Sequence, residues 1–76
     1  MNAQEMFEKL GYKLKKEAYF DFIVTYIKES IEVDFYLNDK SFSVSRELED
    51  YYTWNDVDID LYMVITQKMK ELGWIE

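Results

Sequence analysis

The stretch "FDFIVTYIKESIEVDFYLNDKSFSV", residues 20–44, decides the fold because apolar side chains recur in it at every second position. Successive side chains of a strand point to opposite faces of a sheet, so this period predicts strands with one apolar face. The apolar positions are Phe20, Phe22, Val24 and Tyr26, then Ile31, Val33, Phe35 and Leu37, then Phe42 and Val44. We therefore predict a three-stranded antiparallel meander whose middle strand is 31–37.

Two short turns, at 28–29 and at 39–40, set the expected register of this meander. The first turn places Phe22 opposite Phe35 and Ile23 opposite Asp34. Both turns put the apolar residues of neighbouring strands on the same side of the sheet, which a slip by one residue would not do.

A helix is predicted at each end of the chain. In "MNAQEMFEKLGY", Asn2 can cap the first turn, Glu5 completes a capping box, and Gly11 can take the left-handed position after the last turn. In "DLYMVITQKMKELGW", residues 60–74, Gly73 follows the last turn in the same way. The apolar stripe of this second helix consists of Leu61, Val64, Ile65, Met69 and Leu72.

Both helices are expected to pack on the apolar face of the meander. The prediction is a single two-layer α+β domain over residues 1–76, in the order α-β-β-β-α. Residues 12–19 are expected to form a connector, extended around Leu14. Residues 46–55 are expected to form an ordered loop, with a helical turn or a short edge strand as the alternatives.

The composition excludes several classes of function. The 76 residues include no cysteine and no histidine, so there is no disulfide, no thiolate metal site and no histidine base. The net charge of −7 opposes direct binding to nucleic acid or to an anionic membrane. With no leader sequence or apolar span apparent, the expected location is cytoplasmic.

The run "NDVDID", residues 55–60, sets three aspartates two residues apart: Asp56, Asp58 and Asp60. A calcium loop that begins at Asp56 would need glycine at its sixth position and glutamate at its twelfth, where this chain has Leu61 and Gln67. A bare magnesium site stays open, but an N-cap at Asp58 or Asp56 explains the aspartates without any ion. We therefore predict a helix cap, no metal site and no cofactor.

Two groups of residues are candidates for an interaction surface. Tyrosine and tryptophan dominate protein interfaces, and the chain has seven tyrosines, five phenylalanines and two tryptophans. The first group combines aromatic and acidic residues: Glu49, Asp50, Tyr51, Tyr52 and Trp54, flanked by Glu47 and Asp56. The second consists of Ile23, Ile27 and Tyr36, on the otherwise polar face of the meander. The alternatives are that the aromatic residues cover the core, and that residues 12–19 or 46–55 cover the second group.

The two ends of the chain, "MNAQEMFEKLGY" and "ITQKMKELGWIE", resemble those of small uncharacterised proteins encoded in phages and prophages of low-GC Gram-positive bacteria. The last helix of those proteins likewise ends in leucine-glycine-tryptophan. The middle of the chain resembles them in being rich in strands, tyrosines and acidic residues. The resemblance implies an accessory protein in the cytoplasm of a bacterial host, and it carries over no functional residues.

The expected function is a non-enzymatic protein–protein interaction module that binds a host or phage protein and is a monomer or a weak homodimer. Mimicry of nucleic-acid charge is a variant, if the acidic residues gather on one surface. The alternatives are an oligomerising structural subunit and a carboxylate metal-dependent enzyme built on Asp56, Asp58 and Asp60.

Overall fold

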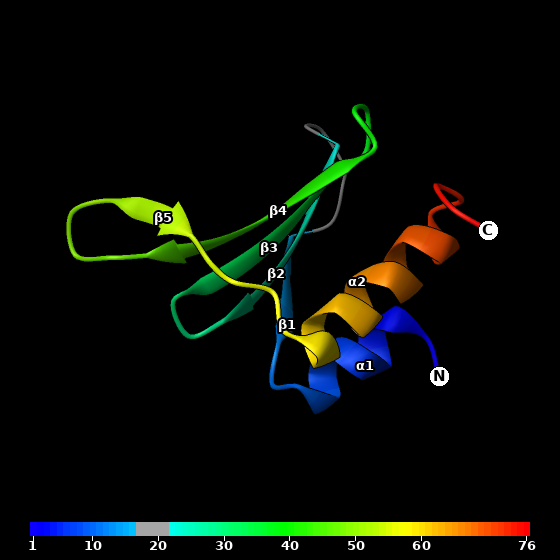
Figure 1. Ribbon diagram of the computed structural model, residues 1–76, viewed down its shortest axis with the longest axis horizontal. Coiled ribbons are helices and arrows are strands. Elements are labelled where there is room, and N and C mark those ends of the chain that lie inside the picture. The colour runs from blue at the N-terminus through cyan, green and yellow to red at the C-terminus, as the bar shows by residue number, and fades with distance from the viewer. Residues whose placement is uncertain (17–21) are drawn as a thin grey trace.

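The computed structural model describes residues 1–16 and 22–76, which form two helices and five strands. Their order is α1 (Ala3–Lys9), β1 (Lys13–Lys16), β2 (Ile23–Lys28), β3 (Ile31–Tyr36), β4 (Ser41–Glu47), β5 (Tyr52–Trp54) and α2 (Ile59–Glu71). The strands form one antiparallel sheet in the order β1-β2-β3-β4-β5, and both helices lie on the same side of it (Figure 1). The α+β class is therefore confirmed, although the described sheet has five strands where three were expected.

The two additional strands lie at the edges of the sheet, in the stretches expected as a connector and a loop. β1 pairs with β2 through an irregularity between Leu14 and Lys16. β5 pairs with β4, and the N–H of Leu48 donates to the carbonyl of Tyr51 at 2.7 Å to close the hairpin. Strands of three or four residues are too short to show a period of two, so their pairing with a neighbour was not evident from sequence.

The register of the meander differs from the expected one by two residues in each hairpin. Val24 lies opposite Phe35, the β2–β3 turn falls at residues 29–30, and Glu29 takes a left-handed φ of 54°. A shift by two keeps every side chain on its face, so the apolar pattern fits both registers equally well. Phe22 precedes β2 and is 48% exposed, and so is not the partner of Phe35. The prediction for Phe20 lies outside the described residues.

The core lies between the helices and the apolar sheet face. The ring of Phe7 stacks on that of Tyr26, with centroids 4.0 Å apart, and the ring of Phe35 meets both edge-on at 6.2 Å. From α2, Leu61, Val64 and Ile65 are buried in the same cluster. The stripe predicted for the second helix therefore faces the sheet as expected.

The predicted helix ends are confirmed. The N–H of Glu5 donates to Asn2 Oδ1 at 2.8 Å and the N–H of Asn2 to Glu5 Oε1 at 3.3 Å, which completes the capping box. Gly11 and Gly73 have φ values of 94° and 77°. The two helices are also joined directly, because the N–H of Ala3 donates to Glu71 Oε2 at 2.7 Å.

Gly73 tests the helix-end assignment, because a Cβ at this position meets no atom within 4 Å and only the backbone conformation is at stake. Gly73→Ala should lower the free energy of unfolding by about 1 kcal/mol, since alanine is strained at positive φ. Gly73→Asn should lose less, because asparagine tolerates this conformation. Urea denaturation of the three proteins measures the difference, and equal losses in both variants would contradict the assignment.

Candidate functional site

The face of the sheet turned away from the helices, here called the second face, carries the polar side chains of the central strands. Their positions alternate with the core residues along β2, β3 and β4. Thr25 lies opposite Asp34, Asp34 opposite Ser43, and Glu32 opposite Ser45. On β5, Trp54 lies opposite Ser45, which extends the second face to the edge of the sheet.

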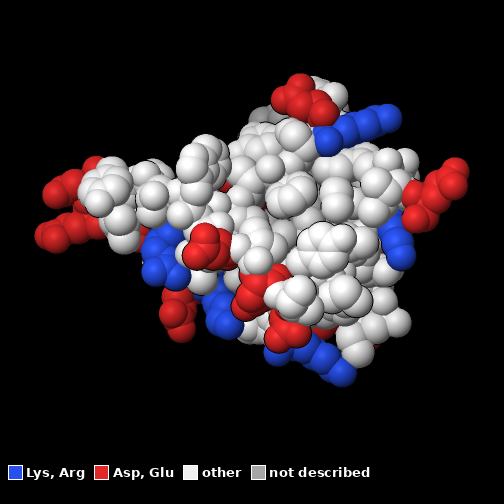
Figure 2. Space-filling model, viewed as in Figure 1, with Lys and Arg blue, Asp and Glu red and all other residues white. Residues whose placement is uncertain are grey.

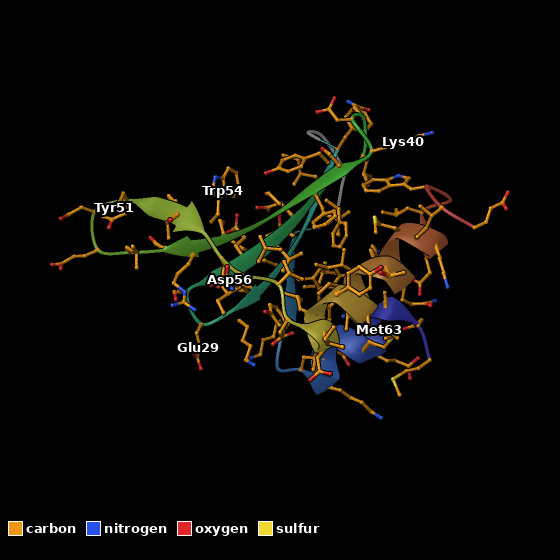
Figure 3. All side chains as sticks on the ribbon, in the orientation of Figure 1. Glu29, Lys40, Tyr51, Trp54, Asp56 and Met63 are labelled. Atoms are coloured by element: carbon orange, nitrogen blue, oxygen red, sulfur yellow. The ribbon has the colours of Figure 1, made fainter. Side chains whose placement is uncertain are left out.

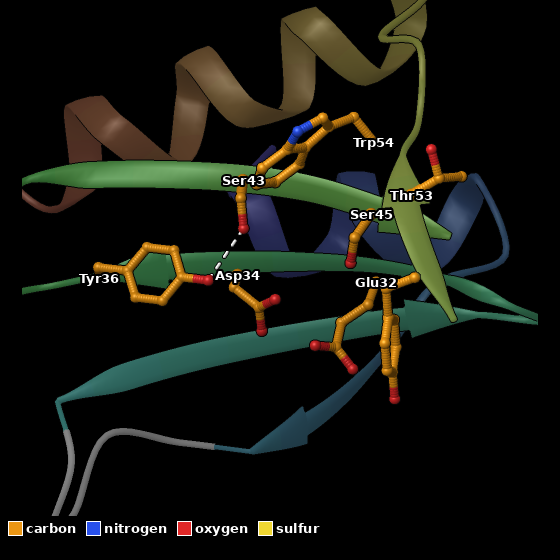
Figure 4. A pocket seen from close by; sticks show the side chains of 8 residues that line it. Glu32, Asp34, Tyr36, Ser43, Ser45, Thr53 and Trp54 are labelled. Carbon is orange, nitrogen blue, oxygen red and sulfur yellow. Dashed lines mark hydrogen bonds between the residues drawn. The ribbon is translucent and has the colours of Figure 1, made fainter. Parts of the chain in front are cut away.

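A groove of about 540 Å³ runs over this face. It is lined by Glu32, Asp34, Tyr36, Ser43, Ser45, Tyr52, Thr53 and Trp54 (Figure 4). Tyr36 lies at one end of the groove, Glu32 and Thr53 lie at the other, and Trp54 stands beside Ser43. The groove thus has a floor of carboxylate and hydroxyl groups from β3 and β4 and an aromatic wall from β5.

The floor is held by hydrogen bonds between side chains. Thr25 Oγ1 donates to Asp34 Oδ1 at 2.6 Å, and the hydroxyls of Tyr36 and Ser43 are 3.0 Å apart. Lys15 Nζ lies 3.4 Å from Glu32 Oε1 and brings a positive charge to the border of the groove. These contacts fix the floor before any ligand is bound.

Asp34 is the group in the floor whose ionisation the fold perturbs most strongly. Its residue is 7% exposed, and this burial raises the pKa of its carboxyl group to about 6. The Thr25 hydroxyl lowers this pKa by donating to the carboxylate, while neighbouring Glu32 raises it further. At neutral pH the carboxyl group of Asp34 is therefore mostly ionised, and neighbouring positive groups only partly offset its negative charge.

The aromatic wall is exposed to solvent. Trp54 is 77% exposed and Tyr52 is 64% exposed, because the β4–β5 hairpin extends beyond the helices (Figure 3). These side chains therefore do not cover the core, which was the alternative explanation for them.

The structure brings some of the predicted interaction residues together and separates others. Tyr36, Tyr52 and Trp54 share the groove, and Ile23 lies directly opposite Tyr36 in an adjoining pocket. Ile27 lies farther along β2, opposite Glu32. The remaining three, Glu49, Asp50 and Tyr51, lie exposed in the turn between β4 and β5.

Ile23, Ile27 and Tyr36 are partly buried, and the described parts of the stretches expected to cover them include β1 and β5, which lie at the edges of the sheet. β1 and β5 pair with the outer strands and widen the second face, because their backbones gain hydrogen bonds there. Lys15 borders this face through its ion pair with Glu32.

Several site residues were not identified from the sequence. For Glu32, Asp34, Ser43 and Ser45 the sequence predicts only a place on the polar face of the meander. These residues could be recognised because they lie opposite one another on adjacent strands. Which residues lie opposite one another is known only once the register of the strands is known. A second omission is the outer side of α2, where Ile59, Tyr62 and Met63 are exposed at helical spacing opposite the core stripe.

The aspartate run begins α2, where the N–H of Leu61 donates to Asp58 Oδ1 at 2.8 Å. Across residues 1–16 and 22–76, no three acidic, cysteine or histidine side chains are grouped as metal ligands. On the face shown in Figure 2, acidic side chains lie in separate groups with apolar and basic side chains between them. This face therefore lacks the continuous acidic surface that mimicry of nucleic-acid charge requires.

A comparison with family models, curated proteins and solved structures finds no match for this chain. The resemblance of the chain ends to phage proteins therefore stays a prediction. Within the described part of the chain, no helix is long and apolar enough to cross a membrane.

Substitutions at Asp58 can show whether its side chain caps the helix or binds a metal ion. Asp58→Ala should lower the free energy of unfolding by about 1 kcal/mol, and Asp58→Asn should change it little because asparagine also caps helices. Millimolar magnesium should leave the melting temperature of the parent unchanged, since a ligand of the folded state would raise it. A magnesium-dependent rise that disappears in Asp58→Asn would instead indicate a metal site.

The raised pKa of Asp34 predicts how stability depends on pH. Between its usual value of 3.8 and about 6, the folded protein binds a proton at Asp34 that the unfolded chain does not. Stability from this group therefore increases as the pH falls through 6 and declines as it rises. When the pH is lowered from 7 to 4.5, the free energy of unfolding of the parent should rise by on the order of 1 kcal/mol relative to that of Asp34→Asn, with allowance for solvent screening.

Urea denaturation of both proteins at the two pH values measures this difference. Asparagine can still accept the Thr25 hydrogen bond, so the variant isolates the charge. A parent-to-variant difference that does not change with pH would contradict the raised pKa.

Proposed function

We propose that this protein is a non-enzymatic interaction module that binds a partner protein in the groove of the second face. The observation that carries the proposal is the exposure of Trp54 and Tyr52 beside a floor that is already held by hydrogen bonds. Large aromatic side chains cost free energy when they stand in water, and they dominate binding when a partner covers them. An ordered floor also lowers the entropy lost on binding.

The groove's exposed aromatic rings support binding of a partner. Its other side chains are carboxylates and hydroxyls, and the chain has no histidine and no cysteine. We propose a partner from a bacterial host or a phage and a place in the bacterial cytoplasm. Both rest on the resemblance of the chain ends.

An oligomerising structural subunit is the second candidate. The exposed side chains of Ile59, Tyr62 and Met63 on α2 favour it, because an apolar helix face can be buried against a copy of itself. This surface is separate from the groove, since α2 lies on the other side of the sheet (Figure 1).

Peptides selected from a random display library on the immobilised protein should bind in the groove. Trp54→Ala should weaken them at least about tenfold, equivalent to ~1.4 kcal/mol, because an interface tryptophan contributes at least this much. Tyr62→Ala is the matched control, since it removes an exposed aromatic side chain from α2, and it should leave the affinity unchanged. Fluorescence polarisation of labelled peptides measures both.

Both side chains are mostly exposed, so neither variant should alter the melting temperature. Equal binding by Trp54→Ala would contradict the groove as the interaction site. A parent that sediments as a dimer, and a Tyr62→Ala variant that sediments as a monomer, would instead favour the structural subunit.

A further inference from the structure

We infer that the groove receives a positively charged side chain of the partner, for which arginine is the best match. This inference rests on the proposed function and adds the chemistry of the partner. Three features of the groove support it: the charge of the floor, the aromatic character of the wall and the size of the space between them.

The floor has an excess of negative charge. Of the eight residues that line the groove, Glu32 and Asp34 carry carboxylates and none carries a positive charge. Lys15 reaches Glu32 from the adjoining pocket, so the immediate balance is two negative charges against one positive. Asp34 accepts a hydrogen bond from Thr25, while an ionised carboxylate has about four acceptor sites. A donor that carries positive charge therefore satisfies this floor better than a neutral one.

The wall favours the same kind of side chain. Trp54 and Tyr52 are exposed aromatic side chains that line the groove together with the two carboxylates. The face of an aromatic ring attracts a cation, most strongly for tryptophan. A guanidinium group can lie flat on such a ring and direct its N–H groups toward a carboxylate. A neutral amide can make the same contacts, but it brings no positive charge.

The size of the groove is sufficient for this occupant. A volume of about 540 Å³ lies within the range of sites that hold small organic ligands. An arginine side chain fits in it together with part of the backbone that presents it. The net charge of −7 also attracts a basic partner before contact is made.

The test uses two peptides, acetyl-Gly-Ser-Arg-Ser-Gly-amide and the same peptide with citrulline, which has the shape of arginine without its charge. Both are added to ¹⁵N-labelled protein in EDTA at pH 7.5. The arginine peptide should shift the indole N–H signal of Trp54 and the backbone amide signals of Ser43 and Asp34. These shifts should reach a plateau as the peptide concentration rises. The citrulline peptide should bind at least about tenfold more weakly. Trp74 packs against the core and serves as the internal control whose indole signal does not move.

Three variants separate the groove from general charge attraction. Glu32→Gln and Asp34→Asn each remove one charge from the floor and should weaken the arginine peptide severalfold. Asp39→Asn removes the same charge from the exposed turn between β3 and β4 and should leave its affinity unchanged. Lowering the pH to 5.5 should also weaken binding, because Asp34 then takes up a proton while arginine keeps its charge.

Equal binding of the two peptides, or no shift of the Trp54 signal by either, would overturn the inference. So would equal weakening by Glu32→Gln and Asp39→Asn, because the attraction would then come from net charge alone. The proposed function survives these outcomes if library-selected peptides still depend on Trp54. If a floor variant fails to fold, the comparison of arginine with citrulline on the parent protein decides the matter.

Discussion

The stack of Phe7 on Tyr26 is the contact on which the two-layer arrangement depends. It brings α1 onto the middle of the sheet, and Phe35 packs against both rings at right angles, so three elements meet in one fully buried cluster. Because α2 joins this cluster from the same side, the whole apolar core lies on one face of the sheet. The second face is thereby left free to carry polar groups, which a sheet covered on both sides could not do.

The same strands that form the core also support the groove. Thr25 and Asp34 lie between core residues on β2 and β3, and their hydrogen bond pairs the two strands on the polar side while Val24 and Phe35 pair them on the apolar side. In the register expected from sequence, Ile23 would face Asp34, an apolar side chain against a carboxylate. In the observed register Asp34 faces Thr25 and Ile23 faces Tyr36. Asp34 is buried in this register, and the burial raises the pKa of its carboxyl group to about 6.

The structural features that the sequence predicts correctly are those determined by residues close together along the chain. The caps at Asn2 and Asp58 and the left-handed glycine at position 73 depend on contacts within one turn. The faces of the central strands follow from the period of two. The register does not, because a shift by two leaves that period intact. The groove combines facing residues such as Glu32 and Ser45 with β5, a strand of three residues, so it could not be recognised before both were known.

The two edges of the sheet are unlike each other, and this limits how copies of the chain can join through their strands. β1 is irregular and carries the exposed side chains of Lys13 and Lys15, features that discourage the addition of another strand. β5 is short, regular and exposed along its length. Growth into a fibre needs two receptive edges on every molecule. A chain with one receptive edge can pair once, about a two-fold axis, and the assembly then closes.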